Sequence, residues 1–284
     1  MKILVELKNI SLLKDYINCD GLIINTKYSI SSNPCYPFYE LELNKIISWC
    51  KSNNKEIIFR IDKIFDEKEI EEVLEFVNQK IEYNFIYTDF AIFTHFKKMN
   101  RLNQLYYFAQ TYLCNKEDIA YYTSKGVKTL ISNELSIDEI KIITNSVKEN
   151  VGILAYGYFP IFYTRREIVS LYNDYSNNVL NKKMTLKKFG EYELKEELRT
   201  EKYKLIENDN FSCIYSSSKM FIDYDLDLTK FDFIYLSNSF IDDKETKKVI
   251  DFYHNIEEGS LENNEGITFD NTFKSFLYKT NEIL

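Results

Sequence analysis

Short runs of apolar residues recur along the whole chain, and polar stretches long enough for a helix separate most of them. Each run has at most seven residues and is rich in Ile, Val, Phe and Tyr. Apolar residues at consecutive positions over so short a length are typical of strands that are buried on both faces. We therefore predict eight strands, at 2–7, 20–25, 56–61, 84–89, 105–110, 127–132, 151–156 and 231–237.

Three of the intervening stretches have apolar residues at the three- and four-residue spacing of an amphipathic helix. They lie at 40–53, 66–80 and 136–149. Two of them begin with a capping pattern, because Glu69 follows Asp66 by three residues and Glu139 follows Ser136 in the same way. We predict scaffold helices at these places.

Eight strands that alternate with helices predict a TIM-type (β/α)8 barrel. About 75 residues separate Tyr156 from Phe231, which is far more than one crossover needs. We expect a β-rich insertion between strands 7 and 8, at about 158–230. Its later part has the pattern of two or three antiparallel strands, with turns near Thr200 and at 208–210. No linker rich in Gly, Pro or Ser is present, so we predict one domain over 1–284.

Composition limits the classes of function. The formal net charge is −8, so nucleic acid would have to bind at a local basic patch. The five cysteines form no C-x-x-C pair, which argues against a disulfide framework and a self-contained zinc or iron–sulfur site. No apolar run reaches ~18 residues and the first residues do not resemble a signal peptide, so we expect a cytoplasmic protein without a membrane span.

Arginine is scarce, since only five of the 36 basic residues are Arg and the others are Lys. A chain that uses Lys wherever charge alone matters keeps Arg where a planar, always charged fork is needed. The five arginines are therefore candidates for binding sites: Arg60, Arg101, Arg165, Arg166 and Arg199.

The active site of a TIM-type barrel lies at the C-terminal ends of its strands. The predicted strand ends carry a polar ring made of Glu6, Asn25, Asp62, Asp89, Gln110, Thr111, Glu134, Tyr156, Gly157, Ser237 and Asn238. With Arg165, Arg166 and Arg199 from the insertion, such a mouth could bind an anionic small molecule, or the base and phosphate of a nucleotide. The alternative is that these groups cap helices and satisfy loop backbone.

Nucleophilic hydrolytic chemistry has little support in the sequence. The two histidines, His95 and His254, both fall in predicted helices of the outer ring. Neither belongs to an H-E-x-x-H pattern, and neither a G-x-S-x-G elbow nor a glycine-rich phosphate loop is present. Carboxylate pairs such as Asp62 with Asp89, or Glu134 with another acid, could act as acid and base or hold a metal, but any barrel offers such pairs.

Two long motifs resemble peptidase family U32, the collagenase-like proteases. The first is "ELSIDEIKIITNSVKENVGILAYGYFPIFYTRRE", whose matching positions are Glu134, Glu139, Tyr156, Gly157, Pro160, Tyr163 and Arg165 or Arg166. The second is "EELRTEKYKLIENDNFSCIYSSSKMFI", with Glu196, Glu197, Arg199, Tyr203 and Glu207 at matching positions. The resemblance runs almost from end to end, and the family fold is a TIM-type barrel. We predict catalytic roles for Glu134, Asp89 and Tyr156, and substrate binding by Arg165, Arg166, Arg199, Gly157, Tyr163 and Thr111.

Within the family, the chain looks most like short bacterial members that pair with a longer U32 paralogue. That resemblance implies a role in 5-hydroxylation of the wobble uridine of tRNA, with prephenate as the implied source of the hydroxyl group. Hydroxylating members usually hold an iron–sulfur cluster with four cysteines, the first of them just after the motif arginine, where this chain has Glu167. Cys213 is the only cysteine in the second half of the sequence. We therefore predict that this chain has no cluster of its own.

Three functions remain open. The first is a component of tRNA hydroxylation, to which a basic stretch with nearby aromatic residues would contribute (Lys182, Lys183, Lys187 and Lys188, with Tyr175 and Phe189). The second is a peptidase that uses carboxylates or a carboxylate-bound metal. The third is a non-catalytic subunit that completes a heterodimer with the longer paralogue, which is compatible with the first.

Overall fold

The computed structural model describes residues 1–30, 40–109, 112–179, 190–198, 200–208 and 210–273. The chain divides into two compact units. One consists of Met1–Gly157 with Met220–Leu284, and the other of Tyr158–Lys219. The second unit begins where we predicted the insertion to begin, and it ends before the predicted limit of about 230.

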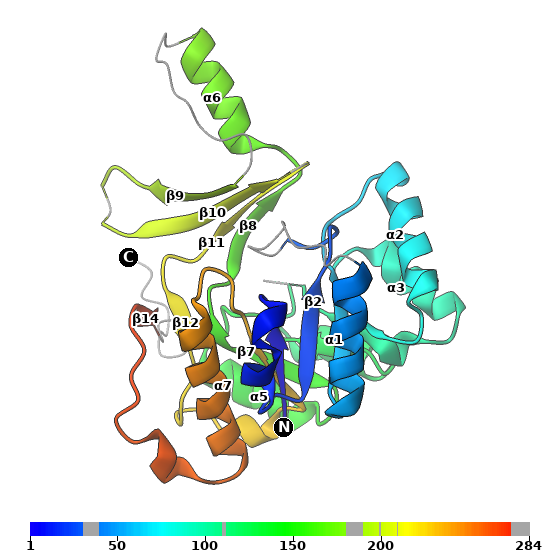
Figure 1. Ribbon diagram of the computed structural model, residues 1–284, viewed down its shortest axis with the longest axis vertical. Helices are drawn as coiled ribbons and strands as arrows, with labels where there is room; N and C mark the ends of the chain where they lie inside the picture. Colours follow the sequence, from blue (N-terminus) through cyan, green and yellow to red (C-terminus); the bar gives the residue numbers. More distant parts are fainter. Residues whose placement is uncertain (31–39, 110–111, 180–189, 199, 209, 274–284) are drawn as a thin grey trace. The chain divides into compact units, whose positions relative to one another are not determined.

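The first unit contains a closed barrel of eight parallel strands (Figure 1). Each strand pairs with the next along the chain, and the last pairs with both the first and the seventh. The predicted TIM-type barrel is therefore confirmed. Its strands are β1 (Lys2–Glu6), β2 (Gly21–Asn25), β3 (Glu56–Ile61), β4 (Asn84–Tyr87), β5 (Leu105–Tyr107), β6 (Lys128–Leu130), β7 (Val151–Gly157) and β13 (Phe233–Leu236).

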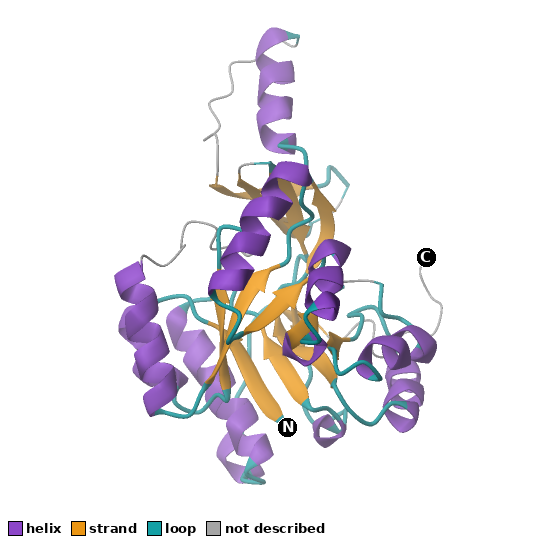
Figure 2. Cartoon of the chain, turned by 90° about the vertical axis from the view of Figure 1, so that its right-hand side faces the viewer, coloured by secondary structure: helices purple, strands orange, loops and turns teal. Residues whose placement is uncertain are grey.

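Helices surround these strands in the first unit (Figure 2). The three helices predicted from periodicity are present, and the capping boxes at Asp66 and Ser136 are both formed. The described helices of this unit are η1 (Ile10–Tyr16), α1 (Glu40–Ser52), α2 (Glu67–Gln79), α3 (Phe90–Lys98), η2 (Leu102–Gln104), α4 (Lys116–Thr123), α5 (Ile137–Ser146), η3 (Leu228–Lys230), α7 (Asp243–Glu257) and η4 (Leu261–Asn264). Within the described residues, no helix is long and apolar enough to span a membrane.

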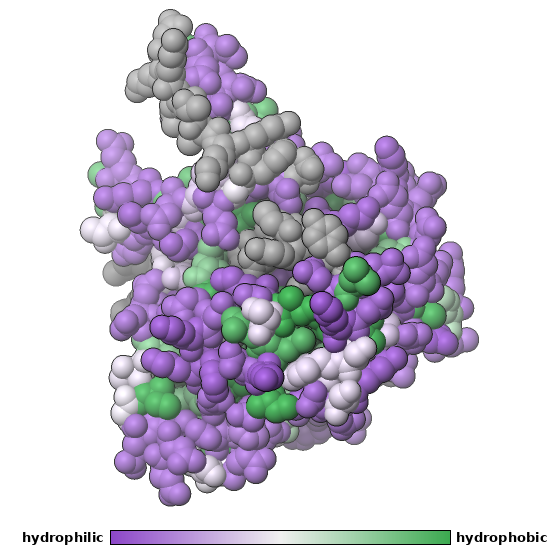
Figure 3. Space-filling view, in the orientation of Figure 1, coloured by the Kyte–Doolittle hydropathy of each residue, from purple (hydrophilic) through white to green (hydrophobic). Residues whose placement is uncertain are grey.

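Side chains fill the interior of the barrel. At the N-terminal ends of the strands, the Glu56 carboxylate accepts hydrogen bonds from Lys2 Nζ at 2.7 Å, Asn84 Nδ2 at 2.7 Å and the Tyr106 hydroxyl at 2.5 Å. Above them, the ring of Phe233 occupies the space that a side chain at Gly152 would need. The interior is thus a packed core, and on the face that Figure 3 shows, most of the coloured surface is hydrophilic with smaller apolar areas.

Gly157 ends β7 in a conformation that only glycine adopts easily. Its φ is +116°, and a Cβ atom there would lie 2.2 Å from the carbonyl oxygen of Ser237. The chain leaves the barrel at this point. It returns through β12 (Lys219–Phe221), in which Met220 pairs with Gly157 in antiparallel fashion, and β14 (Thr272–Phe273) is the last strand of the same sheet.

The second unit is built on a four-stranded antiparallel sheet in the order β8-β11-β10-β9. These strands are β8 (Pro160–Thr164), β9 (Gly190–Lys195), β10 (Lys202–Asn208) and β11 (Phe211–Tyr215). The predicted β-rich insertion is thus present, with an additional strand formed by the aromatic segment after Gly157. The sequence pattern also missed α6 (Ile168–Asn178), which lies between β8 and β9.

Candidate functional site

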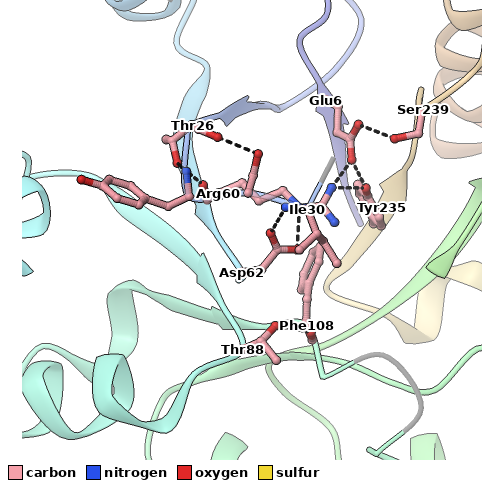
Figure 4. A network of polar contacts seen from close by, with 11 residues as sticks. Glu6, Thr26, Ile30, Arg60, Asp62, Thr88, Phe108, Tyr235 and Ser239 are labelled. Carbon is pink, nitrogen blue, oxygen red and sulfur yellow. Dashed lines mark hydrogen bonds and ion pairs between the residues drawn. The ribbon is translucent and has the colours of Figure 1, made fainter. Parts of the chain in front are cut away.

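Arg60 lies at the centre of a buried polar cluster inside the barrel (Figure 4). It is on β3 and its side chain is 3% exposed. Its Nε atom donates to Asp62 Oδ2 at 2.7 Å, and its Nη1 atom donates to Glu6 Oε1 on β1. One guanidinium thus bridges two carboxylates that are both inaccessible to solvent. We call Glu6, Arg60, Asp62 and Tyr235 the Arg60 cluster.

Tyr235 on β13 completes this cluster. Its hydroxyl accepts a hydrogen bond from Arg60 Nη1 at 2.9 Å and donates one to Glu6 Oε1. Residues of the loop after β13 also bind Glu6, because Ser239 Oγ donates to Oε2 at 3.4 Å and Asn238 Nδ2 donates to the main-chain oxygen. The cluster therefore ties together strands that are far apart in sequence.

The same cluster holds the loop that follows β2. Asp62 Oδ1 accepts a hydrogen bond from the main-chain N–H of Ile30 at 3.0 Å. The Thr26 hydroxyl donates to the carbonyl oxygen of Arg60 at 2.7 Å. Asp62 thus uses one oxygen for the guanidinium and the other for this loop, so its position sets that of the chain at the C-terminal end of β2.

The electrostatics of the Arg60 cluster are unusual for a purely structural core. Two carboxylates share one guanidinium in a region without solvent contact, where burial disfavours charge. Burial raises the pKa of Tyr235 well above its ordinary value, so its hydroxyl keeps its proton and remains a donor. The cluster fixes the ends of β1, β3 and β13 in one arrangement.

Part of this cluster was foreseeable. Glu6 and Asp62 belong to the predicted polar ring, and the scarcity of arginine singled out Arg60. Tyr235 was missed, although the alternation of Phe233, Tyr235 and Ser237 along one strand could have suggested that it points to the same side of the sheet as they do.

The three predicted catalytic residues lie at separate places on the barrel. Asp89 caps α3, where Oδ1 accepts from the N–H of Ala91 at 2.9 Å and Oδ2 from that of Phe65 at 3.0 Å. Glu134 is exposed in the turn before α5. Tyr156 is buried, and its hydroxyl donates to Glu245 on α7. Asp89 and Tyr156 thus have separate partners, on α3 and α7, and Glu134 lies in a third place, so the catalytic roles of all three stay predictions.

The predicted substrate-binding residues fall partly outside the described structure, because Thr111 and Arg199 are not among the described residues. Arg165 and Arg166 are exposed between β8 and α6. The ring of Tyr163 stacks on Phe211 across the sheet, with centroids 6.0 Å apart. Their roles in substrate binding, like that of Gly157, stay predictions.

Glu207, a position of the second family motif, has a clear structural role in the second unit. It is completely buried, and its carboxylate accepts from the N–H groups of Val169 at 2.6 Å and Ser170 at 2.9 Å. The Ser170 and Ser212 hydroxyls also donate to it, at 2.6 and 3.0 Å. A buried carboxylate from β10 therefore binds the free N–H groups at the start of α6.

The described cysteines do not fit an iron–sulfur cluster, which needs several thiolates at one place. Cys19 and Cys50 are buried in the first unit, and burial raises the pKa of each thiol to about 12. Cys114 is exposed, and Cys213 is buried in β11 of the second unit. Among the described residues, no three His, Cys, Asp or Glu side chains are grouped so that they could hold a metal ion.

The histidines lie where the sequence predicted them, on α3 and α7. His95 Nε2 is 2.9 Å from Asn78 Oδ1. Burial lowers the pKa of His95 below its ordinary value, so the ring is neutral near pH 7. His95 thus contacts a neighbouring helix on the outer ring.

Two comparisons with known proteins found a match. The sequence matches peptidase family U32 over residues 34–280. The solved structure of the U32 peptidase Mk0906 is similar with a TM-score of 0.47 and 11% identity, over 84% of this chain and 92% of that one. No curated protein matches the sequence. Because the family match spans most of the chain, this protein belongs to peptidase family U32.

Proposed function

We propose that this chain is a component of tRNA wobble-uridine 5-hydroxylation that acts with a longer U32 paralogue and has no iron–sulfur cluster of its own. Prephenate is the proposed source of the hydroxyl group. Membership of family U32 and the similarity of both motifs to the short bacterial members support this function. The chain would then work as one half of a heterodimer.

The observation that carries the proposal is the chemistry at the motif where hydroxylating members place a cluster cysteine. Glu167 stands there, and its Oε1 atom accepts a hydrogen bond from the main-chain N–H of Asn210 at 3.4 Å. The nearby Cys213 is fully buried in the sheet, where its register partner on β8 is Tyr163. This motif has a structural role in the second unit, so redox chemistry would have to come from a partner subunit.

Deletion of the gene tests this proposal. We expect wobble nucleosides derived from 5-hydroxyuridine to disappear from bulk tRNA, as measured by mass spectrometry, and to return when the wild-type gene is supplied. A Glu167→Gln variant should restore them, because the proposal gives this residue no cluster to bind. Unchanged nucleoside levels in the deletion strain would refute the function.

The proposed heterodimer leads to a second, independent prediction. The tagged chain should co-purify with a longer, cysteine-rich U32 paralogue, and the chain alone should show no hydroxylation. A chain that purifies alone and hydroxylates tRNA without a partner would contradict the proposed division of labour.

A peptidase reaction is the second candidate, and the two buried carboxylates of the Arg60 cluster are the observation that favours it. Two carboxylates in one site can serve as general acid and general base. Purified protein, with and without divalent metals, should then cleave gelatin or a peptide library. Turnover that Glu6→Gln or Asp62→Asn abolishes, in protein that circular dichroism shows to be folded, would make hydrolysis the better interpretation.

A further inference from the structure

The segment from α3 to the start of β6 is basic in an otherwise acidic chain. Between residues 90 and 128 there are six Lys and Arg against two Asp and Glu, whereas the whole chain has a net charge of −8. This surplus does not belong to the candidate site described above. Lys97 and Lys98 lie on α3 and Lys116 on α4, and the other three follow these two helices, which come after adjacent strands of the barrel.

On α3 the basic residues share the exposed face. Lys97 and Lys98 follow the exposed Phe90 by seven and eight positions, which places all three on one side of the helix. Arg101 follows the end of the helix and is also exposed. No ion pair within the described part of the chain involves any of these cations. Their charge is therefore available to a ligand.

The end of α4 supplies an exposed aromatic ring beside another cation. Tyr121 is 49% exposed, and Lys125 Nζ lies 4.2 Å from the centre of its ring. The two helices pack together through Phe93 and Tyr122, whose ring centroids are 5.7 Å apart. This contact joins the first half of α3 to the last turn of α4.

The loops beyond the two helices are also in contact. A Cβ atom at Gly126 would lie 3.5 Å from that of Asn103, and Lys128 Nζ donates to the Asn103 carbonyl oxygen at 2.5 Å. Lys97, Lys98, Arg101, Tyr121 and Lys125 all lie at the C-terminal ends of these two helices or shortly after them, and we call them the α3–α4 surface. Because helices run antiparallel to the strands they follow, this surface lies at the end of the barrel opposite its mouth.

We propose that the α3–α4 surface binds RNA, with its cations against phosphates and the Tyr121 ring against an unstacked base. Cations that are not neutralised by an ion pair within the described residues, beside an exposed aromatic ring, are the combination that single-stranded RNA requires. An acidic protein partner would require the cations for binding but would not require the exposed Tyr121 ring. The identification of this RNA as tRNA rests on the proposed function. The surface would then bind a part of the tRNA that is distant from the reacting nucleotide.

Binding of the purified full-length chain to bulk tRNA, measured by fluorescence anisotropy over a range of salt concentrations, tests the inference. The variant is Lys97→Glu, Lys98→Glu and Lys125→Glu. Loss of three phosphate contacts should weaken binding at 0.1 M salt by about tenfold or more and reduce the slope of log K against log salt by about two. Tyr121→Leu should weaken binding to an unpaired oligonucleotide by about fivefold or more.

The matched control carries the same charge change on other helices, as Lys51→Glu, Lys244→Glu and Lys248→Glu, and should bind nearly as tightly as the wild type. Circular dichroism establishes that each variant is folded. Equal affinity of the two triple variants would overturn the inference, as would a wild-type chain without salt-dependent tRNA binding. The inference would also be overturned if the charge reversal abolished capture of an acidic protein but left tRNA binding unchanged. If the charge reversal weakens tRNA binding but the deletion strain has normal wobble nucleosides, the RNA-binding surface is supported and the proposed function is refuted.

Discussion

Replacing Arg60 with Met should destabilise the barrel unit strongly. Methionine keeps a flexible, unbranched stem of similar length but removes the cation that lies between Glu6 and Asp62. Breaking a buried ion pair by removing one partner typically costs about 3–5 kcal/mol. Because one guanidinium here serves two carboxylates, we expect a loss of about 5 kcal/mol in the free energy of unfolding at pH 7.5. The melting temperature should fall by about 10–20 °C.

The loss in the free energy of unfolding caused by Arg60→Met should depend on pH in a defined direction. In the variant, the folded state holds two buried carboxylates that have lost the Arg60 guanidinium, and taking up protons would neutralise them. The folded variant therefore binds protons more readily than its unfolded state, so its stability relative to the wild type decreases as the pH rises. The deficit should be larger at pH 8 than at pH 5.

Trp49 allows the unfolding of the barrel unit to be measured specifically. It is the only tryptophan of the chain and lies on α1 of the barrel unit, so its fluorescence during urea denaturation reports on the unit that contains the cluster. The matched control combines Arg60→Met with Glu6→Gln and Asp62→Asn, which removes all three charges and should recover much of the lost stability. If the single variant is within about 1 kcal/mol of the wild type, or its deficit is the same at pH 5 and pH 8, the electrostatic reasoning is wrong.

Three further predictions concern single side chains. Gly157→Ala should lower the thermal stability of the barrel by about 3 kcal/mol or more, since its Cβ atom would meet a carbonyl oxygen at 2.2 Å, whereas Gly259→Ala, with φ +72° and open space around it, should cost about 1 kcal/mol. Glu207→Gln should increase hydrogen exchange in the first turn of α6, and protection equal to the wild type would contradict its capping role. Tyr156→Phe should cost about 1 kcal/mol in a thermal melt through loss of the bond to Glu245, and it should abolish wobble hydroxylation only if Tyr156 is catalytic.

The barrel was predictable because its information is local. The six residues of β3 match the predicted strand from Glu56 to Ile61, and the capping boxes at Asp66 and Ser136 form as their spacing indicates. Each of these signals depends on neighbours within one strand or one helical turn. The strands buried on both faces also contain few polar residues, which makes them visible in the sequence.

The second unit was less predictable because its information is not local. The start of α6 has no side-chain cap at Glu167, and its N–H groups are satisfied by Glu207, which lies 37 and 38 residues further along the chain from the residues it binds. The segment at 160–164 becomes a strand only because β11 pairs with it. No pattern within these segments contains that information, so α6 and β8 were missed.

The candidate site shows the same division. The sequence by itself determined the eight strands, their order around the barrel and the polar residues at their ends, since burial on both faces selects a continuous apolar pattern. The tertiary structure alone decided which polar groups meet. Arg60 contacts Glu6 across 54 residues of sequence and Tyr235 across 175, because closure of the barrel brings β13 beside β1 and turns their side chains into the same interior. Charges removed from water must find partners at short range, and only the closed barrel provides them.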